Sequence, residues 1–344
     1  MPLYIPQNYR PTLVPEMTEQ AIKLLKDSFQ QRFSQALNLR RVTAPLFVLS
    51  DTGVNDDLSG VEEPVSFSIP AMNGRKAEIV HSLAKWKRIK LGEYGIHAGW
   101  GLYTDMNAIR TGEDLDNIHS LYVDQWDWER TIDREDRNIR FLKKIVDDIF
   151  LVLKETEWLI YKTYHHIAPV LPDKITYIHS EELLAMYPDL SPKERENKIT
   201  EKYKAVFIIG IGKKLSNGEQ HDGRAPDYDD WITPNEDGYF GLNGDILLWN
   251  PTLQSAFEVS SMGIRVDGAS LKKQLEITGQ QNKMKYDFHK KVYEGRLPLS
   301  IGGGIGQSRL CMFFLRNAHI GEVHASIWPE DMIKKCAENN IVLK

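Results

Sequence analysis

Apolar residues recur at every fourth position near the start of the chain, which is the pattern of a helix with one buried face. The pattern predicts a helix that is capped by Thr18 and ends near Leu37. Its stripe consists of Ala21, Leu25, Phe29, Phe33 and Leu37. The same spacing predicts the longest helix of the chain from about Asn138 to Tyr161. Its apolar side consists of Phe141, Ile145, Ile149 and Leu153.

Alternating and continuous runs of β-forming residues predict strands elsewhere in the chain. In residues 120–129 the alternation puts Gln125 and Asp127 on one face and Trp126 and Trp128 on the other. Further strands are predicted at residues 39–47, 174–179, 205–211, 245–249 and 256–266. A proline within the first of these runs indicates an edge strand or an interrupted ladder.

Local signals place the turns, a further helix start and one long loop. Asn73-Gly74, between short β-like runs, predicts a hairpin. Ser191, followed by a proline and then a glutamate at the third position, forms a capping box that opens a helix. A helix is expected over about residues 270–293, and a glycine-rich turn follows it. Residues 212–244 show little periodicity and contain several aromatic residues, so we expect an ordered functional loop there.

Strands and helices do not alternate strictly along the chain, which argues against a parallel sheet built from repeated units. We therefore expect an α/β fold of the α+β type, with a central, mostly antiparallel sheet flanked by helices. No internal repeat or linker divides the sequence, so residues 1–344 are expected to form a single catalytic domain.

Composition narrows the class of protein. The chain has 344 residues, a net charge of −5 and a pI of about 6.1, which argues against nucleic acid as the main partner. Its two cysteines provide no disulfide framework, which suits a reducing compartment. The first residues have no signal-peptide core, and no run approaches the ~20 apolar residues that span a bilayer. We expect a cytoplasmic protein with no membrane partner.

The glycine-rich segment Gly302–Arg309 is the first motif that could carry chemistry. Its glycines allow close approach of a ligand to the backbone, and a helix that begins there directs its N–H groups at an anion. A tight strand-to-helix turn would use the same residues without any ligand. Arg309, immediately inside the helix, favours phosphate binding. The spacing fits neither a dinucleotide-binding fingerprint nor a Walker A loop.

Other charged residues have both a functional and an ordinary interpretation. Asp245 and Glu258, at the start and end of two neighbouring predicted strands, suit Mg²⁺, although paired acids there are more often solvated or salt-bridged. Arg110 suits bidentate contact with a phosphate, or it is a surface arginine.

Residues 81–88 hold three cations in four positions, a pattern that usually marks a solvated face. The tryptophan among them indicates instead that this segment packs against the fold and leaves only some of the charges free. Residues 224–231 put three acids in an aromatic loop or in an ordinary turn.

Taken in order, these segments resemble the three motifs of class II aminoacyl-tRNA synthetase catalytic domains, especially the aspartate and asparagine enzymes. Residues 41–46, with Pro45, resemble the first motif, which builds the dimer interface in that family. Arg110 and the turn and strand after it resemble the second motif, whose arginine holds the α-phosphate of ATP. The glycine-rich segment resembles the third, whose arginine, here Arg309, binds the γ-phosphate. The implied ATP-binding glycines are Gly303, Gly304 and Gly306.

The sequence resembles the aspartate–ammonia ligase family more closely still, from about residue 17 to 330. The matching segments read HSLAKWKR, YVDQWDWER, RAPDYDDW, LNGDILLWNP, SSMGIRVD and IGGGIGQSRL. The resemblance implies that L-aspartate, ATP and ammonia react with Mg²⁺ to give L-asparagine, AMP and pyrophosphate through a β-aspartyl-adenylate. It also implies a homodimer.

The same resemblance implies roles for individual residues. Asp245 and Glu258 would be the magnesium ligands. The substrate-binding set would be Lys87, Asp127, Ser260, Arg265 and Asp227, with Lys87 and Arg265 on the α-carboxylate and Asp227 on a loop closing over the site.

The catalytic set implied is Asp56, Arg110 and Gln125. Arg110 would neutralise the triphosphate, and Gln125 would hydrogen-bond the reacting carboxylate or phosphate. Asp56 would either bind the α-amino group or receive a proton from the attacking ammonia, and the sequence leaves both roles open.

Two other functions use the same motifs. A synthetase would pass aspartate to tRNA, but the motifs take up the whole chain and leave no residues for an anticodon-binding region. An inactive relative could act as a binding module, but every inferred phosphate and magnesium ligand is present. The ligase interpretation therefore fits the sequence better than either alternative.

Overall fold

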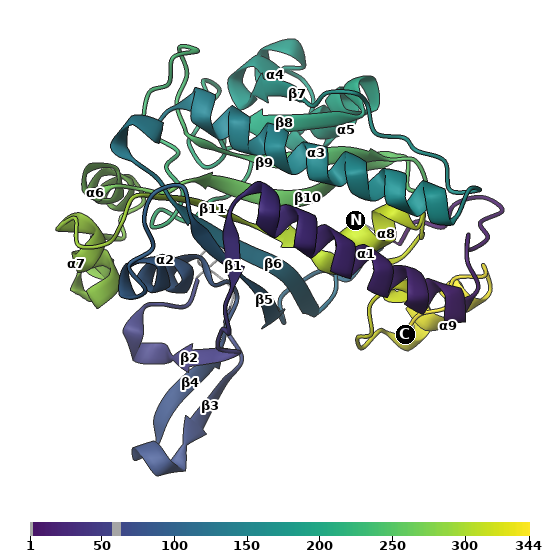
Figure 1. Cartoon of the computed structure of the whole chain (residues 1–344), viewed down its shortest axis with the longest axis horizontal. Coiled ribbons are helices and arrows are strands. Elements are labelled where there is room, and N and C mark those ends of the chain that lie inside the picture. Colours follow the sequence, from purple (N-terminus) through teal and green to yellow (C-terminus); the bar gives the residue numbers. More distant parts are fainter. Residues whose placement is uncertain (1–2, 57–62) are drawn as a thin grey trace.

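The computed structural model describes residues 3–56 and 63–344, and a large, mostly antiparallel sheet forms its centre (Figure 1). The sheet has eight strands in the order β1-β5-β6-β11-β10-β9-β8-β7. They are β1 (Leu39–Arg41), β5 (Gly101–Ile109), β6 (Tyr122–Thr131), β11 (Ser300–Gly306), β10 (Ser255–Ile264), β9 (Asn243–Asn250), β8 (Ala205–Ile209) and β7 (Thr176–His179). Only the two outermost pairs, β1 with β5 and β7 with β8, are parallel. The predicted fold class is therefore confirmed.

Two long helices, α1 (Pro15–Ala36) and α3 (Ile139–Thr163), lie side by side across one face of this sheet (Figure 1). The predicted apolar stripe of α1 is buried. Its Phe29 packs on Trp126 with ring centroids 4.7 Å apart, and Phe33 packs edge-on to Trp128 at 6.0 Å. The predicted capping residue was wrong. The helix begins at Pro15, and the Thr18 hydroxyl donates to the Val14 carbonyl at 3.1 Å.

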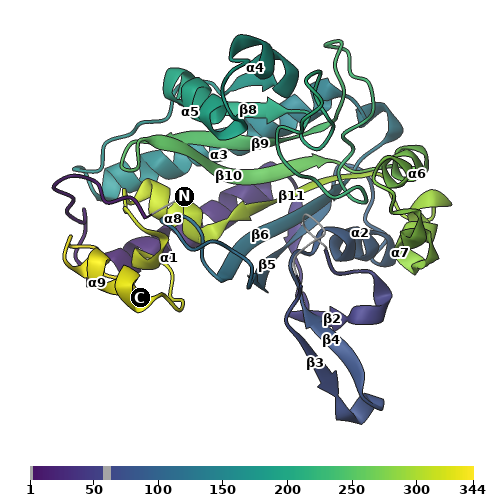
Figure 2. The same ribbon diagram turned by 180° about the vertical axis from the view of Figure 1, so that it is seen from behind.

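The remaining helices lie around the edges of the sheet and its opposite face (Figures 1 and 2). They are α2 (Ala84–Glu93), α4 (Ser180–Met186), α5 (Pro192–Tyr203), α6 (Gly268–Ile277), α7 (Asp287–Tyr293), α8 (Gln307–Phe314) and α9 (Glu330–Ala337). The capping box at Ser191 is confirmed, since its side chain accepts from the Glu194 amide. The single helix predicted at residues 270–293 was wrong, because Gly279 takes a left-handed φ of 69° and separates α6 from α7.

A small sheet projects from the main body (Figure 1). It has the order β2-β4-β3, with β2 (Phe47–Leu49), β3 (Ser66–Ile69) and β4 (Arg75–Ile79). The hairpin predicted at Asn73-Gly74 joins β3 to β4, and both residues have positive φ. The strand predicted at residues 39–47 breaks at its proline into β1 and β2. In the described residues no helix is both long enough and apolar enough to cross a bilayer.

The packing of α1 on the aromatic side of β6 gives a test of the core. Phe29→Ala should lower the free energy of unfolding by about 3–5 kcal/mol, because it removes a fully buried ring that contacts Trp126. Urea unfolding measures this change. Gln31→Ala, on the exposed side of the same helix, should stay within about 0.5 kcal/mol of the parent. Equal effects of the two substitutions would contradict the assignment.

Candidate active site

A cavity of about 490 Å³ opens on the sheet face away from α1 and α3. Val123, Gln125 and Asp127 of β6 line it, while Trp126 and Trp128 point into the core on the other side, as the alternation predicted. Most of the predicted site residues meet here. The cavity-lining members are Asp56, Lys87, Arg110, Gln125, Asp127, Glu258, Ser260, Arg265, Gly303, Gly304, Gly306 and Arg309. Asp227 and Asp245 do not line it. The rest of the acidic segment after Asp56, residues 57–60, lies outside the described residues.

The glycine-rich segment is a strand rather than the predicted turn. It forms β11, paired with β6 on one side and β10 on the other. A Cβ on Gly302 would collide with the Glu129 carboxylate and lie 2.6 Å from Nη2 of Arg265. One on Gly304 would collide with Gln125 and lie 2.8 Å from Oδ1 of Asp127. Glycine is needed here because side chains from the two flanking strands meet above this strand.

Helix α8 begins directly after this strand, but its first turn is not open to a ligand in the way the sequence suggested. The Ser308 amide donates to Oδ1 of Asp124 at 3.0 Å, and the Ser308 hydroxyl donates to Oδ2 at 2.8 Å. Asp124 therefore caps the helix. The contribution of this segment to anion binding rests on Arg309, whose Nη1 donates to the Glu258 carbonyl at 3.0 Å.

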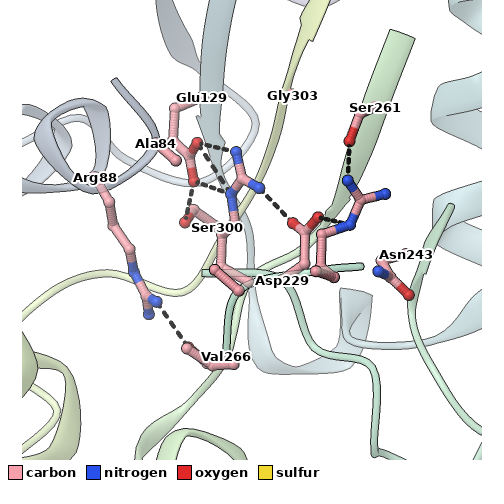
Figure 3. Close-up of polar contacts among 12 residues, drawn as sticks. Ala84, Arg88, Glu129, Asp229, Asn243, Ser261, Val266, Ser300 and Gly303 are labelled. Carbon is pink, nitrogen blue, oxygen red and sulfur yellow. Dashed lines mark hydrogen bonds and ion pairs between the residues drawn. The ribbon is translucent and has the colours of Figure 1, made fainter. Parts of the chain in front are cut away.

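Acids and arginines alternate in a buried row whose three central members line the cavity, and Figure 3 shows the part of the row around Glu129 and Asp229. Its members, in spatial order, are Glu129, Arg265, Asp229, Arg224 and Asp245. Arg265 binds Glu129 through Nε at 3.0 Å and Nη2 at 2.8 Å, and it donates to Asp229 through Nη1. Burial favours the neutral form of Glu129, but the Arg265 guanidinium holds the pKa of this carboxyl below its usual range. Two N–H groups of Arg265 remain for a substrate.

Helix α2 buries the three cations that were expected to be partly solvated. Lys85, Lys87 and Arg88 are all buried, while Trp86 between them is only half-buried. Nζ of Lys87 lies 3.2 Å from Oδ2 of Asp127 and donates to the Gly303 carbonyl at 3.0 Å. Burial lowers the pKa of the Lys87 ammonium, against the opposing charge of Asp127. Hydrophobic patterning missed this because the partners lie elsewhere in the fold: carboxylates for Lys85 and Lys87, and the main-chain carbonyls of Val266 and Pro298 for Arg88.

Asp227 was assigned to the cavity, but the structure places it elsewhere. Its Oδ2 lies 2.9 Å from Nζ of Lys85 and 2.9 Å from Nε2 of His289, and all three side chains are buried. Burial favours the neutral form of Asp227, but the Lys85 ammonium and the hydrogen bond with His289 hold the pKa of this carboxyl far below its usual range. Two residues later, Asp229 lines the cavity instead.

The two arginines predicted to bind phosphate line the same cavity. Arg110 follows the last residue of β5, and its Nη2 donates to the His81 carbonyl at 3.2 Å, while Nη1 lies 3.7 Å from Glu113. Arg309 enters from α8, on the far side of β6 and β11. They come from separate segments and converge on one space, as the sequence predicted.

The predicted metal pair sits inside its strands rather than at their ends. Asp245 is the third residue of β9 and Glu258 the fourth of β10. Nη2 of Arg224 donates to Asp245 at 2.6 Å. Burial raises the pKa of the Asp245 carboxyl to about 7, and the charge of Glu258 adds to the rise, although Arg224 opposes it. Two neighbouring carboxylates therefore repel each other beside the cavity. Within residues 3–56 and 63–344 no cluster of three or more metal-ligating side chains occurs.

Several cavity-lining residues carry no sequence signal strong enough to find them. They are His119, Asp124, Lys193, Arg224, Tyr228 and Asp229. Arg224, Tyr228 and Asp229 stand in residues 224–231, which the sequence singled out, but nothing in that segment distinguishes them from Asp227. Lys193 stands in a helix that reads as an ordinary amphipathic surface element, and only the three-dimensional arrangement brings it to the cavity.

Comparison with known proteins adds a second line of evidence. Residues 16–340 match the family described as aspartate–ammonia ligase. The chain is 58% identical to an aspartate–ammonia ligase of Bacteroides thetaiotaomicron over 338 residues, 98% of each chain. It is 57% identical to one from Clostridium perfringens over 341 residues, 99% of each chain. This chain belongs to the aspartate–ammonia ligase family.

Solved structures confirm the fold expected of this ligase family member. An asparaginyl-tRNA synthetase from Pyrococcus horikoshii, complexed with asparaginyl-adenylate, has a TM-score of 0.66 over 91% of this chain and 70% of its own, at 14% identity. One from Entamoeba histolytica, with the same adenylate, has a TM-score of 0.62 over 90% of this chain and 67% of its own, at 15% identity. The chain therefore has the class II synthetase fold.

The crowding above β11 gives a test that needs no ligand. Gly302→Ala should lower the free energy of unfolding by about 1–3 kcal/mol, because the added methyl group meets the buried Glu129–Arg265 pair. Gly112→Ala places its methyl group in open space and should be neutral within about 0.5 kcal/mol. Urea unfolding of both variants measures the difference. A neutral Gly302→Ala would mean that the pair does not cross the strand as described.

Proposed function

We propose that this chain joins ammonia to the β-carboxylate of L-aspartate, with ATP cleaved to AMP and pyrophosphate, through a β-aspartyl-adenylate. The observation that supports this most is the convergence of Arg110, Arg309 and the Arg265 row on one cavity. The name of the aspartate–ammonia ligase family, to which nearly the whole chain matches, gives two of these substrates, aspartate and ammonia. The structural relatives bind asparaginyl-adenylate, the same class of intermediate on the same fold.

The amino-acid part of the substrate is an anion with one ammonium group, and the cavity offers partners for each. Arg265 and Lys87 would hold the α-carboxylate, since both line the cavity and both are locked in place by buried carboxylates. Asp127 and Asp229 would receive the α-ammonium. Oδ2 of Asp229 is buried and lies 3.4 Å from Nε of Arg224 without forming a hydrogen bond among the described residues, so a substrate N–H would complete its hydrogen bonding. The Ser260 hydroxyl is also buried and has no hydrogen-bond partner among the described residues.

The reacting atoms would meet between Arg110 and β6. An oxygen of the substrate β-carboxylate attacks the α-phosphorus of ATP, and pyrophosphate leaves. Arg110 would take up the charge that develops on the α-phosphate, and Gln125 would donate to the carboxylate or phosphate and orient it. Ammonia then attacks the acyl carbon, AMP leaves, and the nitrogen loses a proton. Asp56 is buried and lines the same cavity, which suits it to accept that proton.

Asp245 and Glu258 would hold Mg²⁺, which takes one or two protein carboxylates together with phosphate oxygens. The residues fit this ion, because the buried Asp245 carboxylate and the partly exposed Glu258 carboxylate repel each other, and a divalent cation would relieve that repulsion. Bound there, the ion supplies charge neutralisation to the polyphosphate. Arg224 already neutralises Asp245 in part, so it would share that carboxylate with the metal or release it.

We also propose a cytoplasmic homodimer in which one catalytic domain spans residues 1–344. Strand β1 lies at the edge of the large sheet, and the segment after it carries the exposed side chains of Leu46 and Phe47. An apolar edge of this kind is suited to an interface with a second copy. No step of the proposed reaction needs RNA.

Arg110→Ala should reduce pyrophosphate release roughly 100- to 1,000-fold while leaving the unfolding midpoint unchanged, because the partner of this arginine is the α-phosphate. The assay contains L-aspartate, ATP, Mg²⁺ and ammonium and no RNA, and it follows asparagine and AMP together. Arg32→Ala, on the outer surface of α1, is the matched control and should keep full activity. A parent enzyme that needs tRNA, or that forms no asparagine, would overturn the proposal.

Glu258→Gln should weaken Mn²⁺ binding in the presence of ATP roughly ten- to a hundredfold, because an amide cannot replace a charged ligand. Electron paramagnetic resonance of free Mn²⁺ measures binding without any turnover. Glu201→Gln, on the exposed side of α5, should leave Mn²⁺ binding unchanged. Unaltered binding by Glu258→Gln would remove this residue from the metal site.

A further inference from the structure

The part of the cavity around Glu258 gathers positive charge from segments that lie far apart in the sequence. Arg309 comes from α8, Arg224 from the long loop before β9, and Lys193 from the first turn of α5, and all three line the cavity. Arg224 is paired with Asp229 and Asp245. Nη1 of Arg309, by contrast, donates to the Glu258 carbonyl at 3.0 Å and lies 4.0 Å from the Glu258 carboxylate. Arg309 and Lys193 are therefore the cations in this part of the cavity that can turn to an anionic ligand.

Lys193 is the outermost of these cations. Its side chain is 66% exposed, compared with 22% for Arg309 and 9% for Arg224. Its Nζ lies 3.0 Å from Oε2 of Glu196 and 3.9 Å from Oδ2 of Asp222. Asp222 is 51% exposed as well, and ion pairs between exposed groups are weak and are easily exchanged for another anion. Glu196 is buried, but its other carboxylate oxygen keeps the contact with His221 when the lysine moves away. Lys193 can therefore turn toward a ligand without disturbing the fold.

The backbone that carries Lys193 is fixed relative to the cavity by contacts that do not involve the lysine. Helix α5 packs on β9 and β10, the strands that carry Asp245 and Glu258. Oε1 of Glu196 lies 3.2 Å from Nε2 of His221, and both side chains are buried. This contact holds the long loop against α5 just before Gly223 and Arg224. The main chain at Lys193 is thus held beside the cavity, while its side chain lies at the exposed edge.

Topology separates Lys193 from the arginine proposed to bind the α-phosphate. Arg110 follows β5, whereas α5 covers β9 and β10, and the strands β6 and β11 lie between them in the sheet. A bound nucleotide that has its α-phosphate at Arg110 and its far phosphates at Arg309 would extend toward Lys193. Lys193 would therefore contact the β- and γ-phosphates and make no contact with the AMP part.

We propose that Lys193 is a third cation for the terminal phosphates of ATP and for the pyrophosphate product. The proposal rests on the proposed function and names a residue of the same site. In it, Lys193 exchanges Asp222 and Glu196 for phosphate oxygens when the nucleotide binds. The two carboxylates take the ammonium back as pyrophosphate leaves, which gives the product a path out along the exposed edge.

The test compares the binding of three probes by isothermal titration calorimetry in MgCl₂, with no aspartate present: ATP, inorganic pyrophosphate and AMP. Lys193→Met should bind ATP and pyrophosphate about tenfold more weakly, because it loses a charge-assisted contact, and it should bind AMP as the parent does. Lys193→Arg should restore most of the affinity. Lys198→Met is the matched control, since Lys198 is exposed on the same helix and does not line the cavity.

The outcomes separate this proposal from the one that it rests on. If Lys193→Met lost affinity equally for all three probes, the substitution would have a general effect on the site, and the role of Lys193 at the terminal phosphates would be overturned. Unchanged affinity for ATP and pyrophosphate would also overturn it. A parent protein that fails to bind ATP would overturn the proposed function itself. Raising the salt concentration should shrink the difference between parent and Lys193→Met, because the contact is electrostatic and exposed.

Discussion

The buried carboxylate of Asp229 is the contact on which the rest of the site depends. It holds Arg265 on one side and Arg224 on the other, and these arginines in turn bind Glu129 and Asp245. Charges can be buried this deeply only when each has a partner, and removing one member leaves its neighbour uncompensated. The row therefore fixes the relative positions of β6, β10, β9 and the long loop. A substrate meets side chains that are already oriented.

The sheet makes this row possible because alternate residues of one strand face opposite sides of the sheet. In β6, Trp126 and Trp128 pack beneath α1, while Gln125 and Asp127 face the cavity. Next to it, β11 contributes almost only backbone, so the long side chains of its neighbours can meet across it. A rigid apolar layer thus lies directly under a polar one. Polar groups arranged in advance in this way suit chemistry in which charge has to be stabilised rather than transferred by the protein.

Hydrophobic periodicity predicted which helices and strands form more accurately than it predicted where they begin and end. The stripe of α1 and the polar alternation of β6 were correct because both reflect a single buried face. The predicted cap at Thr18 was wrong because Pro15 can start a helix without a side-chain cap. The helix at residues 270–293 was predicted as continuous because one glycine in an apolar pattern is a weak signal against many strong ones.

The site residues were predicted chiefly by resemblance, and the structure supplies what resemblance lacks. The buried state of Lys85, Lys87 and Arg88 follows from partners distant in sequence, which no local pattern reveals. The same holds for Asp227, which binds Lys85 and His289 rather than lining the cavity. Lys193 belongs to no motif that predicts ligand binding. Charge pairing across the fold decides these cases, and it depends on which segments the sheet brings together.

The bare backbone of β11 also limits how this enzyme could be altered. Because Gly302 and Gly304 carry no side chains, any replacement there can only take space from the cavity and add nothing to recognise a substrate. An amino acid one methylene longer than aspartate would need room made elsewhere, in the long loop or at the end of β5. Attempts to change substrate preference, by selection or by design, should therefore collect their substitutions in those segments and leave this strand intact.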